Sequence, residues 1–213
     1  MASTLAIVPR HATKPYVDTT DTVERMEELA SGPRGEQSLR LRMTVEDIVR
    51  HVKPKDRLSQ AAAIYDWFRR RWSYINDPDE VELVKDPERI LEEIATKGRA
   101  LGDCDDASTF LAAACRTIGV PAEFVRVGFR KPGLSGPGKL SHVFTVVRDQ
   151  YNRPVVIDPV AASRTPRMLR QASQAVHGLA PEGLAGGEDW LIAPVVMGLG
   201  AFLLVSMSWS GGR

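Results

Sequence analysis

Three residues that could together form a nucleophilic site occur in order along this sequence. Cys104 lies in the motif GDCDDA, at the start of an apolar helix predicted over residues 107–118. His142 lies in the strand-like run SHVF, and Asp158 follows the apolar residues of a second run, VIDP. A thiol, an imidazole base and a carboxylate that orients the base are the parts of a triad that attacks carbonyl groups, provided that they meet in space.

The setting of Cys104 has features that favour a reactive thiol and one that opposes it. A helix N-terminus carries partial positive charge and unpaired N–H groups, which favour a thiolate and can bind an oxyanion. The neighbours Asp103, Asp105 and Asp106 are acidic and disfavour a thiolate by charge. Cys104 is therefore either a nucleophile or a small buried residue at a helix start.

His142 and Asp158 each have an ordinary structural interpretation as well. A histidine on a strand is often a satisfied structural residue, and an aspartate before a proline is typical of a turn. The segment 149–153 predicts a hairpin turn between the two runs. Such a hairpin would bring His142 and Asp158 onto neighbouring strands, almost opposite one another.

The elements that must position these residues are helices first and strands afterwards. Helical signals cover residues 22–29, 56–72 and 86–98, and the last of these segments lies between the N-cap Asp86 and Gly98. Thr44, with Asp47 three residues later, predicts the start of a further helix. Strands are predicted at 121–129, 142–147 and 154–157, with a Gly/Pro-rich loop at 131–139 and a polar surface excursion at 161–190. This order predicts an α+β fold, with N-terminal helices packed on an antiparallel sheet. The predicted organisation is an N-terminal arm with helices at 1–55, a core at 56–160 and a C-terminal extension at 161–213.

The composition is that of one globular domain with extensions. The chain has 213 residues, of which 43% are hydrophobic and 26% charged, and a net charge of +1. That charge gives no general attraction to nucleic acid. Cys104 and Cys115 lie about 16 Å apart along one helix, too far for a disulfide, which fits a reducing compartment. No spaced set of metal ligands or cofactor motif is present, so neither a metal nor a cofactor is predicted.

Both ends of the chain suggest contacts outside the core. Residues 1–20 read as an extended arm, and they lack the features of a secretion signal. Residues 191–209 carry no charge and are just long enough to cross a bilayer, although Pro194 and Gly198 weaken that interpretation. The favoured alternative is a tail buried against the fold or against a partner, so a membrane is not an expected partner.

The motifs GDCDDA, LAA, GVPA, SHVF and VIDP, with IYDWF and WSY before them, resemble the transglutaminase-like superfamily, a papain-like group of cysteine enzymes. The resemblance covers residues 56–160. It implies Cys104 as nucleophile, His142 as base and Asp158 as the acid that orients it, acting on a protein or peptide substrate. Tyr74 becomes a candidate donor near the oxyanion site.

Two departures and one further similarity shape the expected function. Eukaryotic transglutaminases place tryptophan after the nucleophile, where this chain has Asp105, and no calcium-site constellation is evident. Calcium-dependent crosslinking is therefore not expected, and an acyl-enzyme could be resolved by water or by an amine. The overall style of the sequence, including residues 81–84 and 87–90 before the cysteine, is similar to versions from tailed phages and prophages. This similarity implies the bacterial host cytoplasm or the virion as location. The alternative function is a structural virion component that docks on other subunits through residues 1–20 and 191–213.

Overall fold

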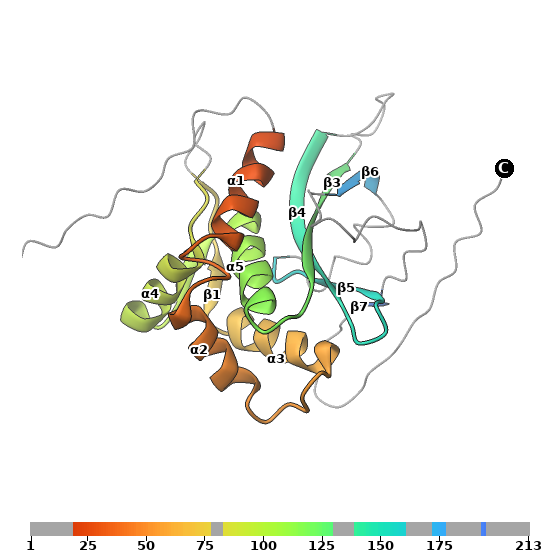
Figure 1. Cartoon of the computed structure of the whole chain (residues 1–213). Coiled ribbons are helices and arrows are strands. Elements are labelled where there is room, and N and C mark those ends of the chain that lie inside the picture. The colour runs from red at the N-terminus through yellow and green to blue at the C-terminus, as the bar shows by residue number, and fades with distance from the viewer. Residues whose placement is uncertain (1–18, 78–82, 130–138, 161–171, 178–192, 195–213) are drawn as a thin grey trace, which may run out of the picture.

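The computed structural model describes residues 19–77, 83–129, 139–160, 172–177 and 193–194. Within these residues, four helices and two short strands precede a fifth helix, which leads into a larger sheet (Figure 1). The helices are α1 (Thr19–Ser31), α2 (Leu39–Val49), α3 (Arg57–Arg69), α4 (Pro87–Lys97) and α5 (Cys104–Thr117). The strands are β1 (Trp72–Tyr74), β2 (Ala100–Gly102), β3 (Ala122–Phe129), β4 (Lys139–Arg148), β5 (Pro154–Ile157), β6 (Ala172–His177) and β7 (Ala193–Pro194).

Helix α4 begins and ends at the residues that its sequence predicts. The side chain of Asp86 accepts a hydrogen bond from Arg89 N at 2.9 Å, and Pro87 occupies the first helical position. Gly98 ends the helix with φ of 77°, a left-handed conformation that glycine adopts without steric cost. These local signals confirm the prediction for this segment.

The predicted start of α2 at Thr44 is wrong. The helix begins at Leu39, and Ser38 is its cap, with its hydroxyl accepting from Leu41 N at 3.1 Å. Thr44 lies inside the helix and donates its hydroxyl to Arg40 O at 2.9 Å. The Ser38 hydroxyl also donates to Glu88 Oε1 at 2.5 Å, a contact 50 residues away in sequence that a local motif does not reveal.

The helix predicted to reach Trp72 ends earlier and gives way to a strand. Helix α3 ends at Arg69, and Trp72 begins β1. Strand β1 pairs in parallel with β2, so that Tyr74 lies beside Gly102. This two-stranded sheet brings a distant segment next to the residues that precede Cys104.

The larger sheet has the strand order β6-β3-β4-β5-β7. Its four longer strands are antiparallel and β7 joins the edge in parallel, which confirms the α+β fold class. Strand β6 lies within residues 161–190, which were predicted as a surface excursion, and it pairs with β3. The predicted loop at 131–139 lies outside the described residues except for Lys139, which begins β4.

Helix α5 lies between the other helices and the sheet (Figure 1). Its residues from Asp105 to Cys115 are all buried. Phe110 stacks on Phe68 of α3 at a centroid distance of 4.6 Å. The alanines at 112–114 are fully buried and have small side chains, which lets neighbouring elements approach α5 closely. The nucleophile candidate therefore begins the most enclosed element of the described fold.

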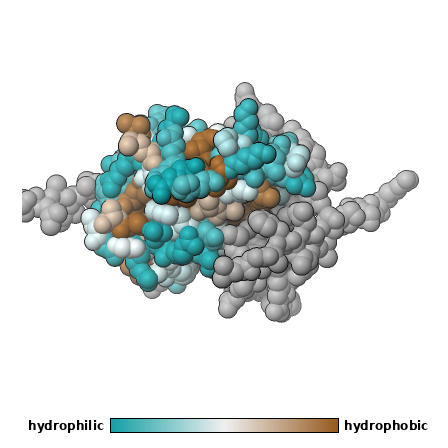
Figure 2. Space-filling view, turned by 90° about the horizontal axis from the view of Figure 1, so that it is seen from below, coloured by the Kyte–Doolittle hydropathy of each residue, from teal (hydrophilic) through white to brown (hydrophobic). Residues whose placement is uncertain are grey.

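Hydrophilic residues cover much of the described surface in Figure 2, with smaller hydrophobic groups between them. Among the described residues, no helix is both long and apolar enough to cross a membrane. Residues 1–18 of the predicted arm and all of the predicted apolar tail except 193–194 lie outside the described residues. The domain boundaries stay predictions, although the main hydrophobic core includes Met26 and Leu41 from the first 55 residues.

Candidate active site

Cys104 is the first residue of α5, as the sequence predicts, and its thiol is partly buried. The cap residue Asp103 has extended backbone angles, φ −108° and ψ −158°, and its side chain accepts from Asp106 N at 3.5 Å. The first turn of a helix leaves backbone N–H groups unpaired and carries partial positive charge. The position of Cys104 thus favours the thiolate and offers donors to an oxyanion.

Two hydroxyl groups hold the start of α5 against the strand that carries His142. The Ser108 hydroxyl lies 2.6 Å from Cys104 O and 3.2 Å from Val143 O, so its proton joins the first turn to β4. Thr145 Oγ1 donates to Ser108 O at 3.0 Å. The sequence alone does not single out Ser108 or Thr145. Ser108 lies one turn after Cys104, and Thr145 lies three residues after His142. These spacings are the only sequence signal that could have indicated their contact.

His142 and Asp158 form a buried pair. His142 Nε2 lies 2.8 Å from Asp158 Oδ2, and the two side chains are only 9% and 2% exposed. Val160 N donates to Asp158 Oδ1 at 3.0 Å, and the Tyr65 hydroxyl donates to the backbone oxygen of Asp158 at 3.3 Å. Because Nε2 is hydrogen-bonded to the carboxylate of Asp158, Nδ1 is the ring nitrogen that can interact with a thiol.

The hairpin brings His142 and Asp158 together as predicted, with an offset of two residues between them. Thr145 pairs with Ile157, so the same register continued would place Asp158 opposite Phe144. His142 and Phe144 are two apart on one strand and therefore point to the same face. The side chains of His142 and Asp158 meet diagonally across the end of β5.

Charge and hydrogen bonding make the imidazole of His142 unusually basic. Burial lowers the pKa of His142, but hydrogen bonds and charges from Asp158 and Cys104 outweigh it and raise the pKa from 6.5 to about 10. At neutral pH the ring is therefore an imidazolium between a carboxylate and the thiol of Cys104. A thiolate–imidazolium pair is the state in which a cysteine nucleophile is activated.

The raised pKa predicts that the folded state loses stability as pH rises. The protonated ring stabilises the fold fully below the unfolded value near 6.5, and this contribution disappears as pH rises through the folded value of about 10. Urea unfolding between about pH 8.5 and 10, where the unfolded chain holds neither the ring proton nor the thiol proton, should show a falling free energy of unfolding, with a shallower slope in His142→Gln. Equal slopes in the two proteins would contradict the assigned ion pair.

A family comparison now adds to this geometry. The sequence model of the transglutaminase-like superfamily matches residues 42–159, more than half of the chain. The chain belongs to the transglutaminase-like superfamily. No curated protein matches it significantly.

Solved structures similar to this superfamily member include two described as inferred proteases. The one from Parabacteroides distasonis is 12% identical, with a TM-score of 0.49, over 67% of this chain and 26% of the other. The inferred cysteine protease from Cytophaga hutchinsonii is 16% identical, with a TM-score of 0.45, over 75% and 48%. LapG of Legionella pneumophila is 17% identical, with a TM-score of 0.40, over 77% and 78%. The chain thus spans about a quarter and about a half of the first two proteins.

Tyr74 lies close to Cys104 of this superfamily member, through the pairing of β1 with β2. Burial raises the pKa of Tyr74, and the nearby charges of Cys104 and Asp103 raise it further. Its hydroxyl donates to Asn76 Oδ1 at 2.7 Å, and the residue is 50% exposed. Its role as an oxyanion donor stays a prediction, because that role would require the hydroxyl to leave Asn76.

The three acids around Cys104 are turned inward at the helix start. Asp105 Oδ1 accepts from Asp106 N at 2.8 Å, and both residues are almost fully buried. Burial, followed by a hydrogen bond and charge from Asp103, raises the pKa of Asp105 well above 3.8. Burial also raises the pKa of Asp106, to about 7, although Lys85 opposes the shift. The raised pKa of Asp105 and the pairing of Asp106 with Lys85 both act to reduce the negative charge that the sequence places beside the thiol.

Among the described residues, the same three acids lie close enough together to hold a metal ion. One carboxylate oxygen from each of Asp103, Asp105 and Asp106 lies within 4.8 Å of the others. The ammonium group of Lys85 already lies 3.5 Å from Asp106 Oδ2 and supplies a positive charge there. That no metal or cofactor takes part stays a prediction.

Proposed function

We propose that this protein is a cysteine enzyme that cleaves or transfers an amide through Cys104, His142 and Asp158. The buried pair of His142 and Asp158, at 2.8 Å and next to a thiol at a helix N-terminus, is the observation that carries the proposal. Its substrate class is a protein or a peptide, because the reacting group is a carbonyl of an amide bond.

In the proposed reaction the thiolate of Cys104 attacks the amide carbonyl, and a carbon–sulfur bond forms. The negative charge that develops on oxygen is stabilised by backbone N–H groups at the start of α5. The imidazolium of His142 gives its proton to the leaving amine as the carbon–nitrogen bond breaks, which leaves a thioester. Water or a second amine then gives a proton to the neutral imidazole, attacks the thioester and releases Cys104.

The protonated resting state of His142 fits this sequence of steps. Asp158 accepts from Nε2, holds the ring orientation and stabilises its charge. The thiol needs no further base once its proton lies on the ring. Hydrolysis as a peptidase and transfer as an acyl transferase share every step up to the thioester.

The alternative, a virion or assembly protein that retains this fold as a scaffold, rests on residues 1–20 and 191–213. These segments lie almost entirely outside the described residues. The phage origin, the virion partners and the location in the host cytoplasm or virion therefore stay predictions. A working triad is compatible with such a role, since a virion can carry an enzyme.

Alkylation of the native protein by iodoacetamide tests the proposed triad. We expect Cys104 to react faster than free cysteine at pH 6, because it lies beside the imidazolium of His142 and at a helix N-terminus, the setting of activated cysteines. Cys115 should stay unmodified, since it is fully buried and burial raises its pKa to about 12. Peptide mass mapping after a timed quench gives both rates in one sample.

Two controls separate activation from mere exposure. In 8 M urea both cysteines should react at the rate of free cysteine. In native His142→Gln the rate at Cys104 should fall to that of free cysteine or below. A wild-type rate no higher than that of free cysteine at pH 6 would refute the proposal.

A further inference from the structure

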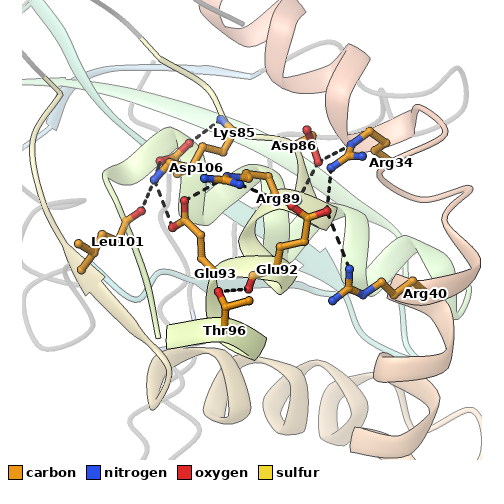
Figure 3. Close-up of polar contacts among 10 residues, drawn as sticks. All are labelled: Arg34, Arg40, Lys85, Asp86, Arg89, Glu92, Glu93, Thr96, Leu101 and Asp106. Carbon is orange, nitrogen blue, oxygen red and sulfur yellow. Dashed lines mark hydrogen bonds and ion pairs between the residues drawn. The ribbon is translucent and has the colours of Figure 1, made fainter. Parts of the chain in front are cut away.

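A buried ion pair between Lys85 and Asp106 joins the segments around the nucleophile (Figure 3). Asp106 lies two residues after Cys104, is 1% exposed, and accepts from Lys85 N through Oδ1 at 2.6 Å. Its other oxygen, Oδ2, lies 3.5 Å from Lys85 Nζ. The backbone and the side chain of one lysine thus bind both oxygens of one carboxylate.

The same ammonium group also binds the chain on the other side of Cys104. Lys85 Nζ donates to Leu101 O in β2, three residues before the nucleophile, as Figure 3 shows. It also lies 3.7 Å from Glu93 Oε2 of α4. A single side chain therefore fixes residues before and after Cys104 relative to each other.

Gly102 completes this arrangement because the carboxyl group of Asp106 fills the space where its side chain would be. A Cβ on Gly102 would lie 2.3 Å from Asp106 Oδ2 and 2.8 Å from Asp106 Cβ. The backbone of β2 consequently packs directly on Asp106. The glycine of the GDCDDA motif is explained by this contact.

We propose that Lys85 and Asp106 are positioning residues that hold Cys104 in register with His142. This inference rests on the proposed function. Buried ion pairs add little net stability, since the cost of removing two charges from water offsets their attraction. What the pair supplies is a fixed geometry for the turn that carries the thiol, and a displacement of about 1 Å at a reacting group can cost about 100-fold in rate.

The variant Lys85→Met tests the pair and keeps the backbone N–H that Asp106 binds. Removal of the ammonium frees Leu101 O and leaves the carboxyl group without its counter-charge. Burial already raises the pKa of Asp106 to about 7, so the carboxyl group can take up a proton and the variant can fold. We expect the iodoacetamide rate at Cys104 to fall about 10- to 100-fold at pH 8, above the pKa of about 7 at which the Asp106 carboxyl group ionises.

The pH profile distinguishes positioning from a purely structural role. If the thiol loses its imidazolium partner, the pH of half-maximal alkylation should move upward in Lys85→Met, and Lys85→Arg should restore most of the shift. Asp106→Asn keeps the volume against Gly102 and the acceptor for Lys85 N, and it should produce a similar loss. Lys85→Met/Asp106→Asn should lose no more than either single variant, because both changes break one unit.

Arg89→Met is the matched control. Arg89 pairs with the same Glu93 at 3.4 Å and with Glu92 at 3.6 Å, but not with Asp106 or Leu101. It should leave the alkylation rate within about twofold of wild type.

A folded Lys85→Met protein with the wild-type rate and pH profile would overturn the inference. If this variant does not melt cooperatively, Asp106→Asn decides by the same criterion. A wild-type protein whose Cys104 reacts no faster than free cysteine would instead refute the proposed function.

Discussion

Cys104→Ser should abolish acyl-enzyme formation, with a loss of roughly 10⁴- to 10⁶-fold in rate. A serine hydroxyl must give up its proton to a neutral base during attack. Asp158 binds Nε2 of His142 and favours the protonated ring, which is a poor acceptor for that proton. The burst of p-nitrophenolate from p-nitrophenyl acetate, one equivalent per protein, measures the step without knowledge of the natural substrate.

Cys115→Ala is the matched control for the loss of a thiol. Cys115 is fully buried in α5, about three turns from Cys104, and contributes to the core. The burst should persist in full while the melting temperature falls modestly. If the burst survives in Cys104→Ser but disappears in Cys115→Ala, Cys115 and not Cys104 forms the acyl-enzyme.

The elements that the sequence predicts well are those with local signals. Asp86, Pro87 and Gly98 mark the ends of α4 because capping and backbone conformation are properties of neighbouring residues. The hairpin between β4 and β5 is likewise encoded in its turn, where Asn152 adopts φ of 62° and Asp149 accepts from Arg153 N at 2.8 Å. The three triad candidates follow the order of the elements along the chain: Cys104 begins α5, His142 lies in β4, and Asp158 follows β5.

The contacts that the sequence does not predict join residues far apart. Lys85 gives no sign in the sequence that it binds Asp106 and Leu101, because nothing local relates a lysine after a loop to a helix start. The parallel pairing of Tyr74 with Gly102 involves only three residues on each strand, too few for an alternating pattern. Burial also reverses a prediction based on charge, since it raises the pKa of Asp105 well above 3.8.

This reversal answers the objection that acids beside Cys104 would suppress a thiolate. An isolated carboxylate in a buried site is costly, and the group lowers that cost by taking up a proton or by pairing with a cation. Burial raises the pKa of Asp105, which favours the first, and Asp106 does the second through Lys85. Asp103 and Asp105 then act as caps that accept from Asp106 N, and the raised pKa of His142 favours a positive ring beside the thiol.

Asp158→Asn should reduce the acylation rate about 10²- to 10⁴-fold while the fold is kept. The carboxylate accepts from Nε2 and so leaves Nδ1 free to take the proton of the thiol. An amide can present its NH₂ group to Nε2 instead, which places the ring proton on Nδ1 and removes the acceptor that Cys104 needs. The loss of a negative charge also lowers the pKa of His142, so the pH of half-maximal alkylation should rise.

Asp56→Asn provides a control with the same chemical change at a distant site. Asp56 caps α3 and accepts from Ser59 N at 3.2 Å, and asparagine caps a helix about as well as aspartate. Its p-nitrophenolate burst should match wild type in rate and amplitude. If Asp158→Asn also keeps the wild-type rate with an unchanged pH profile, the carboxylate does not orient the base. Cys104 and His142 would then have to act as a dyad, with the ring held by packing against the start of α5.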